Sequence, residues 1–236
     1  MKKQTLSIAY VILLTLCAPL ACFYIWLLTV LPIPWAALGE WADSFGKGVL
    51  VFLLFLLPVG LYWLAVFILG VMNIIKSFKM HKSGDTAGCV NGMLLHKYGL
   101  VIFFVVNFIV MFLFYFVVTF GSLVGTRGLA LFAAPVLLPW LTAAVVFTVS
   151  ATWLAIVPGA FYGIQVIRFT LREKKTGYAA AVLHGFLQFV FVADVLDAMY
   201  LAVRKWGRGK KSSAVIGILY IVAAAAVIWG VVYLFD

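Results

Sequence analysis

The hydrophobic positions of this chain form long continuous stretches, and short groups of basic and polar residues separate them. Strict alternation of apolar and polar residues would indicate β-strands. Uninterrupted apolar runs of about 20 residues are instead typical of helices that cross a lipid bilayer. We therefore predict an all-α integral membrane protein with about six transmembrane helices in a single polytopic domain over residues 1–236. The expected helices cover residues 6–31, 49–75, 100–120, 140–167, 178–203 and 214–235.

Prolines and basic clusters mark where these helices should bend or end. Pro19 is expected to kink the first helix, because proline has no backbone N–H and its ring crowds the preceding turn. Residues 32–47 are expected to be an external loop, and residues 121–138 an external loop with an interfacial piece. Residues 76–97 are expected to form a basic cytoplasmic loop that includes Lys97, and the fourth helix is expected to bend at Pro158.

Composition supports a membrane location. The chain is 67% hydrophobic and 10% charged, with a mean hydropathy of +1.20, and a soluble domain would be nearer half apolar. The formal net charge of +10 comes from bases clustered between the apolar runs. This pattern predicts cytoplasmic loops that meet anionic lipid headgroups rather than a nucleic-acid partner. We expect the plasma membrane, with the N-terminus in the cytoplasm.

The sequence contains two similar segments, each of which predicts a hairpin of two helices joined by a basic loop. The first copy runs from Trp63 to Phe104 and the second from Trp153 to Phe191, and each opens with Trp-Leu-Ala. Each copy crosses a short basic loop and re-enters apolar sequence through Leu-His, at His96 and at His184. We interpret this similarity as an internal duplication.

The distribution of bases conflicts with the six-helix prediction. Six spans with both termini in the cytoplasm place the basic segment 204–211 outside, against the positive-inside rule. If residues 178–203 were re-entrant or interfacial, nearly every base would be inside and the chain would cross five times. The duplication favours six spans, and we take six as the prediction with five as the alternative.

Candidate catalytic signatures are missing from the sequence. It contains no His-Glu-x-x-His, no Cys-x-x-Cys and no Gly-x-Ser-x-Gly motif. Two imidazoles from equivalent repeats could hold a haem iron or, with a further ligand, a divalent metal, which makes His96 and His184 cofactor candidates. The simpler interpretation, which we prefer, is a pair of interfacial histidines bonded to carbonyls or headgroups.

Four polar side chains inside the predicted spans are candidates for a substrate or ion pathway. They are Asn107, Gln188, Asp194 and Asp197. Amides in membrane helices more often bond to a neighbouring helix than line a pathway. A carboxylate in hydrocarbon suggests proton or cation coupling. We expect Asp194 and Asp197, however, to lie near the membrane surface and to reach headgroups or the bases of 204–208.

The function favoured by these features is non-enzymatic. We expect an integral subunit of a membrane transport or assembly complex, or a small permease-like binding protein, with another membrane protein or a second copy as partner. One alternative is a membrane-embedded redox, metal or lipid-acting enzyme that uses His96 and His184. A further alternative is a protective or immunity protein that acts through a membrane partner.

Overall fold

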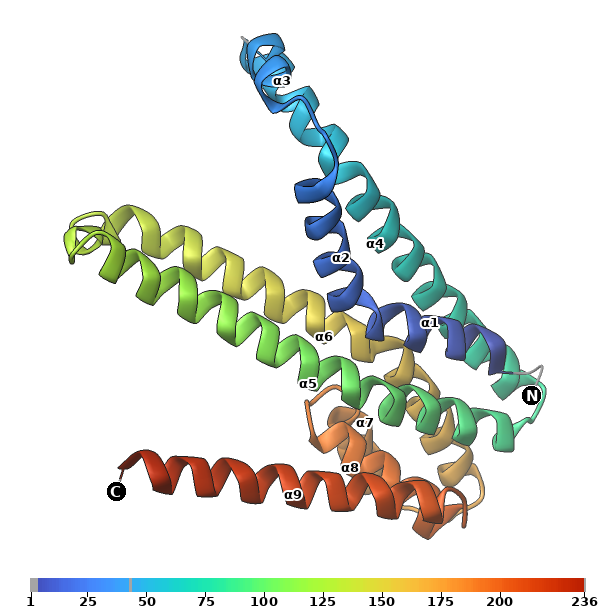
Figure 1. Ribbon diagram of the computed structural model, residues 1–236. Coiled ribbons are helices and arrows are strands. Elements are labelled where there is room, and N and C mark those ends of the chain that lie inside the picture. Colours follow the sequence, from blue (N-terminus) through green and yellow to red (C-terminus); the bar gives the residue numbers. More distant parts are fainter. Residues whose placement is uncertain (1–3, 43, 236) are drawn as a thin grey trace. The chain divides into compact units, whose positions relative to one another are not determined.

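A computed structural model describes residues 4–42 and 44–235, and within these residues the regular structure is helical, without a strand (Figure 1). The first half of the chain contains α1 (Thr5–Thr15), α2 (Cys17–Val30), α3 (Trp35–Trp41), α4 (Phe45–Lys82) and α5 (Thr86–Gly125). The second half contains the 3₁₀ turn η2 (Leu129–Leu131), α6 (Ala134–Arg172), α7 (Tyr178–Leu187), α8 (Ala193–Tyr200), the π-helical turn η3 (Leu201–Lys205) and α9 (Lys210–Phe235).

Three of these helices are long and apolar enough to cross a membrane. They are α4, α5 and α6, and the bent pair α1 and α2 makes a fourth if it is counted as one span. The prediction of an all-helical protein with membrane-spanning helices is therefore confirmed, while a count of six spans is not. The crossing by α9, a helix of 26 residues, stays a prediction.

The bend in the first span is where the proline predicts it. α1 and α2 are inclined at 49° to each other, with the break at Leu16. Pro19 lies in the first turn of α2 and cannot donate to the carbonyl of Thr15, four residues earlier. The helical hydrogen-bond ladder is therefore interrupted just before Leu16, and the chain changes direction there.

The helices extend well beyond their expected ends, so the expected loops are shorter. The basic loop predicted over 76–97 is largely helical, and only Ser83–Asp85 separate α4 from α5. Gly84 adopts a left-handed φ of 72° in this turn, and Asp85 Oδ1 accepts a hydrogen bond of 2.9 Å from the N–H of Gly88. The carboxylate thus satisfies a free donor at the start of α5.

The other two predicted loops are also partly helical. α3 lies within the loop expected over 32–47, and α6 already begins at Ala134, inside the loop expected over 121–138. α6 then continues as one helix through Pro158 to Arg172. Proline is tolerated within membrane helices because neighbouring groups can satisfy the carbonyl that it frees.

The predicted fifth helix over 178–203 is wrong as a single element. The chain leaves helical geometry after Leu187 and resumes at Ala193, and Val192 takes a left-handed φ of 68° between the two helices. The second arm of the proposed repeat is therefore the 10-residue α7, whereas its counterpart α5 has 40 residues. The duplicated hairpin is not confirmed.

The described residues fall into two compact units. Unit 1 contains those of Met1–Ser7, Ile74–Gly99 and Trp153–Asp236, and unit 2 contains those of Ile8–Asn73 and Leu100–Thr152. Unit 2 holds the most apolar parts of the long helices. Unit 1 holds their opposite ends together with α7, α8 and α9.

Unit 2 is built from antiparallel helices joined by a few hydroxyl and amide hydrogen bonds. The Tyr24 hydroxyl of α2 donates to the carbonyl of Phe55 in α4 at 2.7 Å. In the α5–α6 hairpin, Asn107 Nδ2 donates to Thr152 Oγ1 at 3.0 Å (Figure 1). Elsewhere the outer faces of these helices are exposed and apolar, as expected for surfaces that meet lipid.

Unit 1 has a buried core between the beginning of α5, the second half of α6 and the α8–η3 segment. Its fully buried side chains include Cys89, Val90, Met93, Tyr162, Val166, Ala198, Leu201 and Ala202. Gly92 lets α5 approach α6 closely, because a Cβ at this position would lie 2.6 Å from the ring of Tyr162. Small residues at helix contacts of this kind are common in membrane proteins.

Candidate functional site: a buried charge network

Lys97 lies on α5 and is buried, with 2% of its surface exposed. Its Nζ donates to Asp194 Oδ2 at 2.7 Å and to the backbone carbonyl of Gln188 at 2.9 Å. Gln188 caps the C-terminal end of α7, and Asp194 lies in the first turn of α8. One ammonium group therefore joins the end of one short helix to the start of the next, at helix ends whose partial charges favour this pairing.

A second carboxylate continues the network. Asp197 lies one turn further along α8 and is 5% exposed. Its Oδ2 accepts a hydrogen bond of 2.6 Å from Gln188 Nε2, and its Oδ1 is hydrogen-bonded to Nδ1 of His184. Together with Lys97 and Asp194, these residues form the buried charge network: Lys97, His184, Gln188, Asp194 and Asp197.

Two glycines of α6 make room for the network. A Cβ at Gly163 would lie 2.1 Å from Oε1 of Gln188, and a Cβ at Gly159 would lie 2.9 Å from the Cβ of His96 and 3.5 Å from Cε of Lys97. Any larger residue would have to displace these buried side chains. The glycine pair, spaced by four residues on one helix face, therefore sets the depth at which α5 and the end of α7 pack against α6.

Burial changes the acidity of both carboxyl groups. It raises the pKa of Asp194 above its ordinary value of 3.8, and the nearby ammonium of Lys97 opposes this with a smaller effect. Burial also raises the pKa of Asp197, while the hydrogen bonds from His184 and Gln188 act in the opposite direction. Desolvation penalises the charged form of a carboxyl group, so both acids hold a proton more readily here than in water.

The two histidines that the repeat pairs have different surroundings. His96 is fully buried, with its Nδ1 2.9 Å from the carbonyl of Gly92 and its ring against Tyr162. His184 bonds to Asp197, so it belongs to the network. Within residues 4–42 and 44–235, no group of three His, Cys, Asp or Glu side chains is arranged to hold a metal ion.

Of the four pathway candidates, three lie in the network and one does not. Gln188, Asp194 and Asp197 are brought together, whereas Asn107 makes the interhelical bond to Thr152 in unit 2. The expectation that the two aspartates reach headgroups or the following bases is wrong, because both are buried against other partners.

Lys97 is the network residue that the sequence pattern places in the wrong environment. The expectation of a solvated loop base fails because α5 begins at Thr86 and carries Lys97 into the interior of unit 1. One signal could have identified it. Two acids inside an apolar segment need a buried positive partner, and Lys97 lies only three residues before the apolar run that starts at Leu100.

A family model described as a family of unknown function (DUF6652) matches residues 9–208 of the chain. The chain belongs to this family. The match includes all five residues of the buried charge network and ends before α9. No curated protein and no solved structure matches the chain.

The arrangement is suited to holding and exchanging protons. It contains two carboxyl groups, one ammonium and one imidazole within a continuous set of hydrogen bonds that crosses from α5 to α7 and α8. Burial raises the pKa of both carboxyl groups, and protonation of either one would alter the charge balance of its neighbours.

Proposed function

We propose that the protein is a non-enzymatic, permease-like membrane transport protein in which the buried charge network couples protonation to the position of α7 and α8. The observation that carries the proposal is the bridge made by Lys97, whose ammonium binds the end of α7 and the start of α8 at once. A plasma-membrane location with a cytoplasmic N-terminus is part of the proposal.

The geometry of the broken helix supports transport. Many membrane transporters bind ions or substrates where a helix is interrupted, because the freed backbone groups and the helix ends supply oriented partial charges. Here the interruption lies between Leu187 and Ala193. Ionisable residues in the apolar part of a membrane protein are costly, and their usual role is in ion or proton pathways.

The coupling follows from charge balance. While Asp194 is ionised, its attraction for Lys97 holds the α8 end of the bridge. Protonation of Asp194 removes its negative charge and weakens that attraction, so the bridge then depends more on the bond from Lys97 to the carbonyl of Gln188. Protonation of Asp197 likewise weakens its bonds from His184 and Gln188. A proton on either acid can therefore weaken the attachment of α8 to its partners on α5 and α7.

The test is direct observation of proton uptake by the two aspartates. Purified protein in nanodiscs is taken from about pH 8 to about pH 4, and infrared difference spectra record the carboxylic C=O band. We expect Asp194→Asn and Asp197→Asn each to remove part of this band. Glu173→Gln is the matched control, because Glu173 is an exposed acid that pairs with Lys175 at the surface.

Two results would contradict the proposal. One is a difference band that is unchanged in both aspartate variants, because the network would then not exchange protons. The other is unchanged exposure of α7 and α8 across the same pH range, measured by hydrogen exchange of their backbone amides. The proton would then have no structural consequence, and the network would be a static anchor.

A further inference from the structure

The outward face of α7 is apolar, while its inward side carries the polar side chain of His184. Tyr178, Val182 and Phe186 are 79%, 73% and 68% exposed. In contrast, His184 bonds to Asp197 in the interior of unit 1. A helix on the surface of a water-soluble protein has the reverse arrangement. An exposed apolar face of this kind marks a surface that meets a membrane or a protein partner.

Several backbone groups in the turn between α7 and α8 are bonded within the protein, as a hydrocarbon environment requires. The carbonyl freed at Gln188 accepts from Lys97, and the carbonyl of Phe189 accepts from the indole N–H of Trp153 at 3.0 Å. The N–H groups of Phe189 and Val190 donate to carbonyls of the last turn of α7. Irregular backbone is tolerated at membrane depth only when the protein satisfies it in this way.

The chain enters and leaves this hairpin at the same place. The indole N–H of Trp206 donates to Thr170 Oγ1 at 2.9 Å, and Lys205 Nζ donates to the carbonyl of Lys175 at 2.9 Å. The ammonium of Lys175 also lies 3.7 Å from the centre of the Trp206 ring. The segment before α7 and the segment after α8 therefore touch, and residues in direct contact outside the hydrocarbon lie on the same side of a bilayer.

The hairpin is too short to cross. α7 has 10 residues, and at about 1.5 Å per residue it is about 15 Å long, roughly half of a hydrocarbon core about 30 Å thick. A hairpin of this length can enter one leaflet and return. The same conclusion follows independently from the contacts at its two ends.

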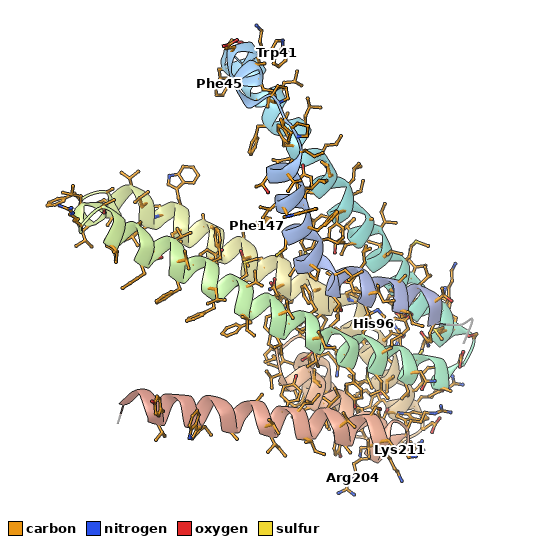
Figure 2. The ribbon with its side chains drawn as sticks, viewed as in Figure 1. Trp41, Phe45, His96, Phe147, Arg204 and Lys211 are labelled. Carbon is orange, nitrogen blue, oxygen red and sulfur yellow. The ribbon has the colours of Figure 1, made fainter. Side chains whose placement is uncertain are left out.

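Exposed bases lie in the segments at the two ends of the hairpin, and Arg204 and Lys211 are labelled among them in Figure 2. The set, here called the basic collar, consists of Arg168, Arg172, Lys174, Lys175, Arg204, Arg208, Lys210 and Lys211. Glu173 is the one acidic residue in the segments 168–177 and 204–211, and it pairs with Lys175 at 2.7 Å. This charge is complementary to anionic headgroups, which bind about fivefold more tightly for each such base.

We propose that α7 and α8 form a re-entrant hairpin in the cytoplasmic leaflet, with anionic phospholipid headgroups bound by the basic collar. We take lipid as the occupant because an apolar face lies next to a basic surface. The acyl chains of a phospholipid would contact the apolar face of α7, and its phosphate would contact the basic collar. The chain then crosses five times, through α1 with α2, α4, α5, α6 and α9, and its C-terminus is outside. This inference does not depend on proton coupling.

The topology is tested with single cysteines in a chain whose native Cys17, Cys22 and Cys89 are serine. An impermeant maleimide is applied to intact cells and to permeabilised cells. We expect Lys174→Cys and Arg208→Cys to react only after permeabilisation. Arg127→Cys, in the turn between α5 and α6, is the control that reacts in intact cells.

Reaction of Arg208→Cys in intact cells, with Lys174→Cys protected, would overturn the re-entrant hairpin, because the chain would have crossed between them. If the cysteine-free protein does not fold, a reporter fused after Asp236 of the native chain replaces this test. A reporter active outside supports five crossings, and one active only in the cytoplasm contradicts them.

The lipid is tested in the full-length protein with phosphatidylglycerol and phosphatidylcholine as probes. A fluorophore on Phe186→Cys in nanodiscs is expected to be quenched by nitroxide-labelled lipid and not by iodide in water. In detergent micelles, Lys174→Glu with Arg204→Glu and Arg208→Glu is expected to lower phosphatidylglycerol affinity at least tenfold, from about fivefold per base. Arg127→Glu is the matched control and is expected to change nothing.

Three outcomes would contradict lipid binding at this surface. The first is equal phosphatidylglycerol affinity in the triple variant and the wild type. The second is quenching of the Phe186→Cys fluorophore by iodide, which means that α7 faces water. The third is efficient Phe186→Cys disulfide formation between two copies, which means that a second copy of the chain covers α7.

Discussion

The two helical hairpins α5–α6 and α7–α8 are held together by different kinds of polar contact. Between Leu100 and Thr152 the first hairpin has a single charged residue, Arg127, and its described polar contacts between helices are neutral bonds such as Asn107 to Thr152. The second hairpin is far shorter, yet it buries two carboxylates and reaches across to Lys97. Phe147 of α6, labelled in Figure 2, is an example of the exposed apolar side chains of the first hairpin.

The difference indicates where each hairpin obtains its stability. Long apolar helices need little more than length and hydrophobicity to remain in a bilayer, so neutral bonds suffice. A 10-residue helix and an 8-residue helix cannot span and lack that support. Their described contacts include the ion pair between Lys97 and Asp194, which under the proposed function a proton would weaken. The short hairpin is therefore the part of the molecule that we expect to change state.

The largest expected effect comes from removing the ammonium that joins the short hairpin to α5. Lys97→Met leaves Asp194 buried without a positive partner, so we expect the free energy of unfolding to fall by about 3–5 kcal/mol. Detergent-titration unfolding in mixed micelles measures this loss. Adding Asp194→Asn should restore most of it, because the uncompensated charge is removed. Lys79→Met, at an exposed position of α4, is the control.

A double variant no more stable than Lys97→Met alone would show that Lys97 contributes mainly through its other contacts. The comparison between the ionic and the neutral hairpin would then no longer hold.

A smaller effect is expected from filling the space that α6 leaves for the network. In Gly163→Ala, the new methyl group meets Oε1 of Gln188, and we expect a net loss of about 1–3 kcal/mol from overpacking. In the long hairpin, Gly121 has no atom within 4 Å of an added Cβ. Gly121→Ala is therefore expected to be neutral or stabilising by about 0.5–1 kcal/mol. Equal losses of stability in Gly163→Ala and Gly121→Ala would show that the close contact between Gly163 and Gln188 does not require glycine.

The stability of the short hairpin should depend on pH through Asp197, whereas the long hairpin has no buried acid between Leu100 and Thr152. The pKa of Asp197 in the folded protein lies above 3.8, so the folded state binds a proton more readily than the unfolded chain. Its contribution to stability should therefore rise as pH falls through the raised pKa toward 3.8, and should be lost again as pH rises. Melting temperatures of the wild type and Asp197→Asn across this range give the contribution by subtraction. If the wild type instead became more stable relative to Asp197→Asn as pH rises, the pKa of Asp197 would be lowered by folding rather than raised.

The smallest effect is expected in the long hairpin. Asn107→Leu removes one neutral hydrogen bond to Thr152 and adds an apolar side chain, so a loss of about 0.6 kcal/mol is expected. The same unfolding assay applies. A loss as large as that of Lys97→Met would mean that α5 and α6 also depend on a specific polar contact.

The sequence predicts the parts of the fold that depend on hydrophobicity alone. The long apolar runs predict α4, α5 and α6, which are long and apolar enough to cross a membrane, and Pro19 predicts the bend between α1 and α2. Both signals act within a single helix. Helix ends are predicted less well. The turn at Ser83–Asp85 is much shorter than the expected loop over 76–97, because basic residues and glycines are compatible with helix when the helix ends pack together.

The sequence predicts most residues of the candidate site, but it does not predict which of them contact one another. Gln188, Asp194, Asp197 and His184 all stand out as polar groups in apolar sequence. Their pairing with Lys97 depends on how α5 packs against α7 and α8, and this is tertiary information that no local pattern contains. The break at Val192 cannot be predicted from the local sequence either. A β-branched residue strongly prefers a negative φ, and Val192 has a left-handed φ of 68°.

The separation of Lys97 from Asp194 along the chain has a consequence for synthesis in the cell. The two residues are 97 positions apart. At roughly 5–20 residues per second, the ribosome makes Lys97 about 5–20 s before Asp194 exists. During that interval the nascent α5 carries an ammonium with no acid of the short hairpin to receive it. If the long apolar hairpins enter the membrane during translation, we expect Lys97 to remain at the aqueous edge until α8 has been made. Unit 1 can close only when α8 has left the ribosome, which makes its assembly a late step in the biogenesis of the protein.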